Sequence, residues 1–144
     1  MRIVIASAGR ERADPAAPLV ADYLARIRKR LPAEETVLRD DRRLTARVAE
    51  DRRRGHLIVV LDERGRQLGS ADLAGLLRSW MNEGLRGATF VIGGAQGLPA
   101  GMRAAADEVL ALSRMTLPHR LARLVLAEQL YRALEILRGS PYHK

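Results

Sequence analysis

The segment from residue 118 to residue 138 limits the possible folds most, because it reads as one long helix with very little polar surface. Pro118 suits a first helical turn, whose N–H groups have no partner inside the helix, and Gly139 ends it. Residues placed about 100° apart form a broad apolar side, its flank and a narrow polar stripe. In that order, these are Leu126, Ala127, Leu130, Ala133, Leu134 and Leu137, then Val125 and Ile136, then Glu128, Arg132 and Glu135.

A helix so nearly apolar all round has to bury two of its sides, and the chain has only 144 residues with which to cover it. We therefore expect one side to pack on a sheet and another to meet a second subunit, which predicts a homodimer. Arg123 projects from the middle of the apolar side, one turn into the helix. Either its stem reaches past the helix end to water, or its cation lies at the rim of a pocket.

The composition is typical of a single domain that spans residues 1–144. The chain is 47% hydrophobic, which is enough to fill a core, and one domain commonly takes about 100 to 200 residues. It has no run of about 18 apolar residues and no charged-then-apolar leader, so we expect a cytoplasmic protein without a membrane partner. With Cys 0, it has no disulfide framework and no thiolate nucleophile, and we expect no metal.

The net charge of +8, from 25 basic and 17 acidic residues, indicates a polyanionic partner, of which nucleic acid is the first candidate. The arginine-rich usage also follows from a GC-rich coding sequence. Aromatic residues make up only 3% of the chain, so we expect no base-stacking platform. The arginine-dense stretch 39–54 predicts a weakly anchored, mobile helix, whose exposed face is either simply solvated or a phosphate-contacting flap that orders on RNA.

Short apolar strands alternate with helices along the chain. We expect strands at 2–6, 35–38, 57–61, 88–92 and 109–112, turns at 7–10 and 62–65, and helices at 19–31, 39–54, 70–80 and 99–106. Because the strands lack a polar alternation, they predict an α/β fold, with a parallel sheet covered on both faces. Ser70 is expected to cap its helix and Trp80 to lie in the core.

Three loops follow strands at the edge where open parallel sheets bind ligands: residues 61–65, 92–97 and 112–119. The glycines of the second loop let main chain approach a ligand closely, although the pattern is neither G-x-G-x-x-G nor a P-loop. In the third loop, leucine and methionine alternate with serine and threonine. This pattern either forms an apolar slot for a flat ring, read at its edge by backbone groups, or is structural filler.

The three histidines have different prospects. His56, at a strand entrance, is expected to be structural, and His119 opens the long helix. His143 lies beside the chain end, where a histidine is usually inert. An imidazole nevertheless suits proton transfer near neutral pH, and a basic tail can fold over a bound anion.

Four motifs together resemble the RlmH-type ribosomal RNA large-subunit methyltransferases, a compact branch of the SPOUT superfamily. They are Ile92-Gly-Gly-Ala-Gln-Gly97, Leu112-Ser-Arg-Met-Thr-Leu-Pro-His119, Arg123-Leu-Val-Leu-Ala-Glu-Gln-Leu-Tyr-Arg-Ala133 and Pro141-Tyr-His-Lys144. The resemblance spans essentially the whole chain. Ala95-Gln96 and the stretch 13–18 depart from the pattern that is usual in the family, and the second departure leaves the RNA contacts of the first loop open.

The resemblance implies a parallel-sheet SPOUT fold with a C-terminal deep trefoil knot, a homodimer, and S-adenosylmethionine bound in the knot. It implies methyl transfer to N3 of pseudouridine 1915 in 23S rRNA, on the assembled ribosome. By matching positions, the cofactor would be held mainly through backbone by Leu61, Gly93, Leu112, Ser113, Arg114, Met115, Thr116 and Leu117.

The same matching places Arg123, Tyr142 and His143 near the RNA target, and His119 at the junction of loop and helix. We expect His143 to assist removal of the N3 proton or to orient the base. Arg123 would stabilise negative charge on the ring or bind phosphate. The alternatives are a SPOUT enzyme that acts on another RNA, such as a tRNA, and a ribosome-binding factor without catalysis.

Overall fold

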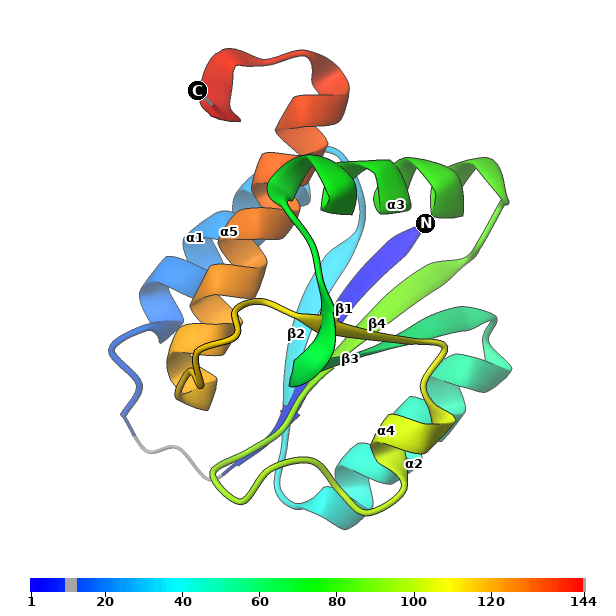
Figure 1. Cartoon of the computed structure of the whole chain (residues 1–144), viewed down its shortest axis with the longest axis vertical. Helices are drawn as coiled ribbons and strands as arrows, with labels where there is room; N and C mark the ends of the chain where they lie inside the picture. The colour runs from blue at the N-terminus through cyan, green and yellow to red at the C-terminus, as the bar shows by residue number, and fades with distance from the viewer. Residues whose placement is uncertain (10–12, 144) are drawn as a thin grey trace.

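The computed structural model describes residues 1–9 and 13–143. They form three layers, in which a five-stranded parallel sheet lies between two layers of helices (Figure 1). The strand order is β2-β1-β4-β3-β5. In chain order the elements are β1 (Arg2–Ala8), α1 (Ala17–Ile27), β2 (Ala33–Leu38), α2 (Asp41–Arg53), β3 (His56–Gln67), α3 (Ser70–Asn82), β4 (Gly87–Ile92), α4 (Met102–Ala105), β5 (Glu108–Ala111), α5 (His119–Arg138) and the 3-10 turn η1 (Pro141–His143).

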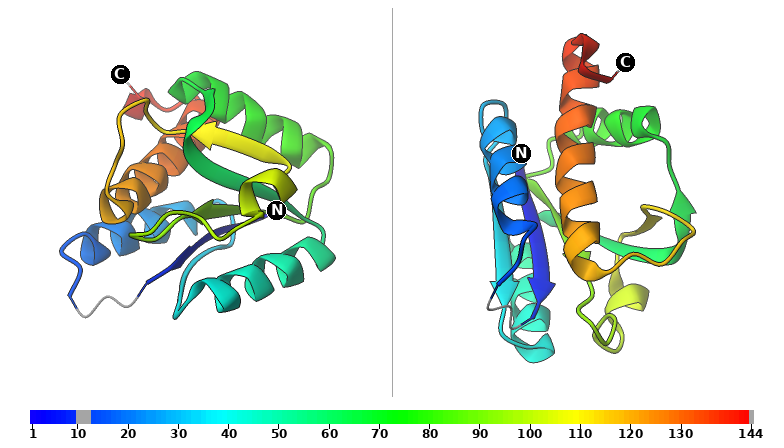
Figure 2. Two further views of the ribbon diagram at one scale, coloured as in Figure 1. Left: turned by 60° about the horizontal axis from the view of Figure 1, so that its bottom comes forward. Right: turned by 90° about the vertical axis from the view of Figure 1, so that its left-hand side faces the viewer.

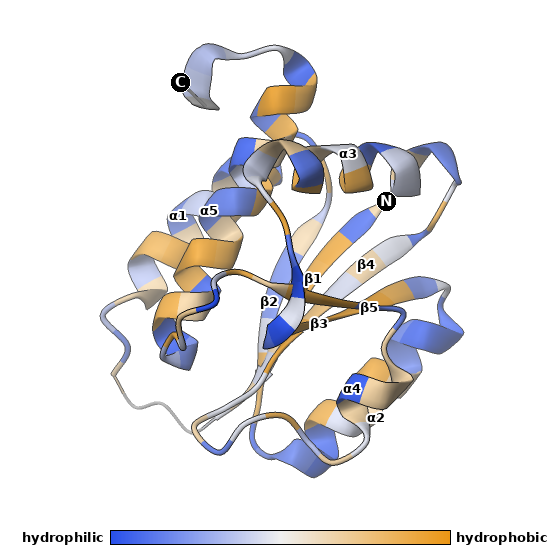
Figure 3. Ribbon diagram, in the orientation of Figure 1, coloured by the Kyte–Doolittle hydropathy of each residue, from blue (hydrophilic) through white to orange (hydrophobic). Residues whose placement is uncertain are grey.

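Each strand sends alternate side chains to opposite faces of the sheet. Ile3 and Ile5 of β1 pack with α1, α3 and α5, whereas Val4 and Ala6 pack with α2 and α4. Figure 2 shows α5 beside α1 on one side of the sheet, and Figure 3 shows the strands largely in orange and much of α2 in blue. The parallel α/β arrangement predicted from the sequence is confirmed, and Trp80 lies in the core.

Two predicted turns are wrong. Ser7 and Ala8 continue β1, while Arg10 lies outside the described residues. The stretch 62–65 does not end β3 but forms a bulge, because Leu61 and Arg66 both lie opposite Leu110 of β5. A Cβ on Gly65 would lie 2.7 Å from the Val109 carbonyl oxygen, so glycine is what allows the bulge to lie against β5.

Two helix starts also differ from the prediction. Asp72 caps α3 by accepting a hydrogen bond from the Gly69 N–H at 2.8 Å, whereas Ser70 is already helical and donates to Gln129. The helix expected at 99–106 is limited to α4, because Gly101 directly before it is left-handed, with φ of 78°. A polar capping residue suggested the first start and an alanine-rich composition the second, and the backbone conformation moved both.

The arginine-dense α2 is anchored more firmly than its composition predicted. Besides Leu44 and Val48, it buries Asp51 completely. The Asp51 carboxylate accepts hydrogen bonds from Thr89 Oγ1 at 2.9 Å and from Arg47 Nε at 2.9 Å. The prediction of weak anchoring was therefore wrong, because a polar network that only the fold assembles holds the helix against the sheet.

The histidine of this network is structural, as predicted. His56 Nδ1 lies 3.0 Å from Thr89 Oγ1. Burial lowers the pKa of His56, and the nearby Arg47 lowers it further, although Asp51 opposes this shift. His56 therefore belongs to the anchor of α2 and not to a ligand site.

The long helix α5 begins and ends where the sequence predicted, after Pro118 and before Gly139, whose φ is 78°. Within one chain it packs between α1 and α3 over the sheet, so much of its apolar surface is covered without a partner. Glu135, predicted to lie in the polar stripe, is only 3% exposed. Its carboxylate pairs with Arg138 of the same helix at 2.8 Å and with Arg30, which follows α1, at 3.9 Å.

Candidate functional site

A cavity of about 950 Å³ lies between the bulge of β3 and the loops that follow β4 and β5, where the three predicted loop segments converge. Most of the residues expected to hold a cofactor line it, and Arg114 is the exception. The first turn of α5 closes one side with His119 and Ala122. The lining residues that were predicted are Leu61, Gly93, Leu112, Ser113, Met115, Thr116, Leu117 and His119.

Main chain forms the wall contributed by the second loop. A Cβ on Gly93 would lie 2.7 Å from the Gly97 carbonyl carbon, and one on Gly94 would lie 2.7 Å from the Ala8 carbonyl oxygen. Gly97 has a φ of 89° and donates its N–H to the Gly94 carbonyl at 2.9 Å. Only glycine fits these close contacts and this positive φ, so the backbone of the loop packs tightly where it lines the cavity.

The β3 bulge supplies a charged rim of the cavity, within the first of the three segments that the sequence predicted to bind a ligand. Asp62 pairs with Arg64 at 3.3 Å and with Arg103 of α4 at 3.5 Å, and its side chain is 10% exposed. Hydrogen bonds from the Arg64 N–H and guanidinium keep the pKa of Asp62 below its usual value. Asp62 directly follows a buried strand, which was a usable signal, whereas nothing in the sequence links it to Arg103.

A hydrogen bond joins the first and third loops. Thr116 Oγ1 donates to the Glu63 carboxylate across the cavity. Within the third loop, the Met115 N–H donates to Ser113 Oγ at 2.9 Å, and the Met115 side chain is 78% exposed. The third loop is thus linked to the bulge, while the apolar side chain of Met115 remains exposed to solvent.

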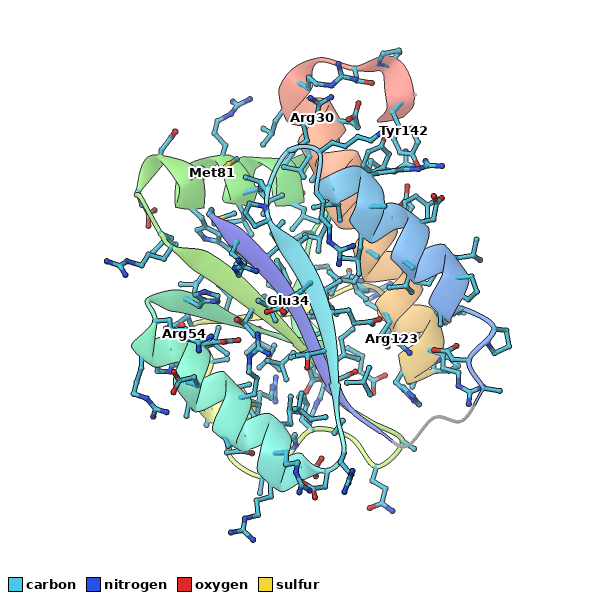
Figure 4. The ribbon with its side chains drawn as sticks, turned by 180° about the vertical axis from the view of Figure 1, so that it is seen from behind. Arg30, Glu34, Arg54, Met81, Arg123 and Tyr142 are labelled. Atoms are coloured by element: carbon cyan, nitrogen blue, oxygen red, sulfur yellow. The ribbon has the colours of Figure 1, made fainter. Side chains whose placement is uncertain are left out.

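Arg123 does not line the cavity and is only 4% exposed (Figure 4). Its guanidinium donates to both carboxylate oxygens of Glu35 in β2, at 2.6 and 2.9 Å, and also to Asp14. The hydrogen bonds to Glu35 raise the pKa of Arg123 despite its burial. This placement differs from both alternatives expected from the sequence, because the cation reaches neither water nor a pocket rim, and the predicted catalytic role stays a prediction.

The C-terminal segment lies at the opposite end of α5 from the cavity (Figure 1). A helix of 20 residues is about 30 Å long, so His119 and Tyr142 are far apart within one chain. The Tyr142 ring packs edge-on against Tyr131, with centroids 4.8 Å apart. His143 ends η1, and its side chain lies outside the described part of the structure.

The sequence model of one protein family, described as "Predicted SPOUT methyltransferase", matches residues 1–143. The chain belongs to the SPOUT methyltransferase family. It is 43% identical to the ribosomal RNA large subunit methyltransferase H of Paracoccus denitrificans, over 100% of this chain and 99% of the relative. The protein of the same name from Sorangium cellulosum is 41% identical over 99% of each chain. Within the SPOUT family, the chain is therefore a member of the methyltransferase H group.

Two solved structures share its fold. The "Probable Methyltransferase from Bordetella pertussis Tohama I" superposes with a TM-score of 0.55 at 14% identity, over 92% of this chain and 95% of that one. The A. aeolicus TrmH/SpoU tRNA modifying enzyme gives a TM-score of 0.53 at 13% identity, over 98% of this chain and 80% of that one. At such low identity, the likeness concerns the fold alone.

Among residues 1–9 and 13–143, no group of three or more His, Asp or Glu side chains is arranged to hold a metal ion. In the same part of the chain, no helix combines the length and apolar character needed to cross a membrane.

Proposed function

We propose that the protein transfers a methyl group from S-adenosylmethionine to N3 of pseudouridine 1915 in the 23S rRNA of the assembled large ribosomal subunit. The observation that carries this proposal is the convergence of three loops on one cavity in a SPOUT family chain. Relatives at 41 to 43% identity bear the name ribosomal RNA large subunit methyltransferase H. We expect the enzyme to act in the cytoplasm, where ribosomes are found.

The residues around the cavity fit S-adenosylmethionine. A volume of about 950 Å³ is at the upper end of the range usual for small-molecule sites, and Leu61, Leu112 and Leu117 supply apolar walls. The glycine wall offers peptide groups to the edge of a ring, and the carboxylates of the bulge suit hydroxyl and cationic groups. When bound, the cofactor supplies an electrophilic methyl group on a sulfonium, and the protein mainly has to align the acceptor.

The C-terminal segment is our candidate for the RNA side of the reaction. His143 would accept or guide the N3 proton, and Tyr142 would help to hold the base, because both matched family positions near the target. His119 lines the cavity wall where an acceptor would enter. Arg123 would have to leave Glu35 and Asp14 to act on the ring or on a phosphate, so a direct role for it requires rearrangement at the start of α5.

The length of α5 supports a homodimer. Because His143 lies at the far end of this helix from the cavity of its own chain, it would serve the cavity of a second subunit. The trefoil knot that the resemblance implies would involve the stretch from β4 to α5. Its candidate segments, the loops after β4 and β5, lie together around the cavity, which supports the proposal.

Methyl transfer from labelled S-adenosylmethionine tests the function. The purified protein should label 23S rRNA in assembled ribosomes, and nucleoside analysis should find the methyl group on N3 of one pseudouridine. Isolated rRNA and tRNA serve as the comparison substrates. Labelling of tRNA alone would favour a SPOUT enzyme with another substrate, and failure to bind the donor in calorimetry would favour a non-catalytic ribosome-binding factor.

A further inference from the structure

We propose that Glu128 is a positioning residue that fixes the C-terminal segment of residues 141–143 on the end of α5. Through this segment it would set where Tyr142 and His143 meet the RNA. The inference rests on the proposed function. It concerns a residue outside the donor cavity and acts on the acceptor side of the reaction only.

The carboxylate of Glu128 is the centre of a hydrogen-bond cluster. Its Oε1 accepts from Arg132 Nε at 2.8 Å and from Tyr142 Oη at 3.3 Å. Its Oε2 accepts from Gln129 Nε2 at 2.8 Å. The side chain is only 18% exposed, so water competes weakly for these bonds. One carboxylate therefore holds both the Tyr142 hydroxyl of the C-terminal segment and the Arg132 guanidinium that lies against the Tyr142 ring.

Tyr142 is enclosed by groups that depend on this cluster. Its ring packs on Tyr131, and the Arg132 guanidinium lies over its face, 5.1 Å from the centroid. Tyr23 lies beside Tyr131, with centroids 6.1 Å apart, so all three tyrosines of the chain gather here. Because Glu128 orients Arg132 as well as the Tyr142 hydroxyl, loss of its carboxylate releases Tyr142 on two sides.

The orientation of Glu128 is itself fixed from another element. The Gln129 side chain, which donates to Glu128, accepts a hydrogen bond from Ser70 Oγ at 2.5 Å. Ser70 belongs to the first turn of α3. One carboxylate oxygen of Glu128 is therefore linked to α3 through Gln129, and the other faces the C-terminal segment. An ordinary ion pair between residues four apart on a helix, such as Glu128 and Arg132 alone, would not fix the carboxylate in this way.

Tyr142 is suited to this role as a neutral donor. Burial raises its pKa to about 12, and the neighbouring Tyr23 and Glu128 contribute to the same shift. Its hydroxyl therefore keeps its proton at neutral pH and can donate to Glu128 throughout the working range of an enzyme.

Substitution of Glu128 tests the proposal, with kcat, the KM for ribosomes and the Kd for S-adenosylmethionine measured for each variant. Glu128→Ala should lower kcat by about ten- to a hundredfold, because misplacing a reacting group by about 1 Å has such an effect. The donor Kd should stay at the wild-type value, since Glu128 does not line the donor cavity. Glu128→Gln keeps an acceptor for Tyr142, so its kcat should lie between those of the wild type and of Glu128→Ala.

Glu83→Gln is the matched control, because this exposed glutamate also makes a side-chain hydrogen bond near a helix end, to Ser79 at 3.1 Å. It should behave as wild type. A double-mutant cycle with Tyr142→Ala separates positioning from general destabilisation. If Glu128 acts through Tyr142, Glu128→Ala should cause no further loss of kcat in the Tyr142→Ala background, whereas additive losses would overturn the proposal.

Hydrogen exchange provides a second readout that does not depend on activity. In Glu128→Ala, backbone amides of the peptide 139–143 should exchange faster, while those of the sheet stay protected. Unchanged exchange there, or wild-type kcat, would refute the positioning role, and if the alanine variant does not fold, Glu128→Gln decides by the same criteria. An inactive wild-type protein would instead refute the proposed function, and the exchange result would still decide the position of the segment.

Discussion

Arg123 joins three parts of the chain at one buried point. Glu35 lies 88 residues away in sequence and Asp14 lies 109 residues away, yet both carboxylates meet its guanidinium. Hydrogen bonds from Arg123 and from the Ala16 N–H outweigh the effect of burial, so the pKa of Asp14 is lowered. The first turn of α5, which lines the cavity, is therefore held to β2 and to the segment before α1 by charge.

Removing the Arg123 cation should strongly destabilise the folded protein. In Arg123→Met, two mostly buried carboxylates lose their partner, and we expect the free energy of unfolding to fall by about 3 to 5 kcal/mol. Urea unfolding measures this directly. Arg43→Met is the control, because Arg43 pairs with Asp40 on the surface with 57% of its side chain exposed, and such pairs contribute at most about 1 kcal/mol. Equal losses in the two variants would contradict the buried ion cluster.

His56 should make the stability depend on pH below neutrality. Because burial lowers its pKa in the folded state, the unfolded chain binds a proton more readily, and stability falls as the pH drops below about 6.5. We expect His56→Gln to show a smaller loss of unfolding free energy between pH 7.5 and 5.5 than the wild type. His119 and His143 remain in both proteins, so the difference reports His56, and identical pH profiles would exclude this effect.

At the scale of elements, the glycine loop after β4 gives a sharp prediction. In Gly93→Ala, the new Cβ would lie 2.7 Å from backbone of Gly97, so the loop would have to open and the cavity wall would change shape. Donor affinity should fall at least about tenfold, measured by calorimetry, since backbone contacts to the ligand are lost. Gly75→Ala is the control, because a Cβ on Gly75 meets nothing within 4 Å.

Elements with strong local signals could be predicted from the sequence. Pro118 and Gly139 indicated the bounds of α5, and apolar runs indicated β1, β3, β4 and β5, whereas the signal for β2 was weaker. The β3 bulge could not be predicted, because residues 62–65 have the composition of a turn and pairing with β5 keeps them in the sheet. For the site, the convergence of the three loops could be predicted, because it follows from the topology of a parallel sheet. The partners of Arg123 and the tyrosine cluster could not be predicted, because they depend on contacts between residues far apart in sequence.

At the scale of the whole molecule, the proposed site combines the cavity of one subunit with the C-terminal segment of the other. This arrangement predicts complementation between two impaired variants. Gly93→Ala weakens donor binding and His143→Ala impairs the C-terminal segment, so each homodimer should have little activity when the donor concentration is kept far below the Kd of the Gly93→Ala variant. After the two are mixed and refolded together, about half of the dimers contain one chain of each kind, and each of these has one intact site. Methyl transfer should return to about a quarter of the wild-type level, and no recovery would mean that both parts act within one chain.

The bulge of β3 also bears on how a ligand enters the cavity. Strand pairing with β5 holds this rim on both sides, at Leu61 and again at Arg66 and Gln67. A rim that is paired with β5 at both ends cannot move outward unless the hydrogen bonds between β3 and β5 break. The loop of residues 112–118 makes no strand pairing, and the hydrogen bond between Thr116 and Glu63 ties it to this rim. We therefore expect this loop, and not the bulge, to move when a ligand enters or leaves the cavity.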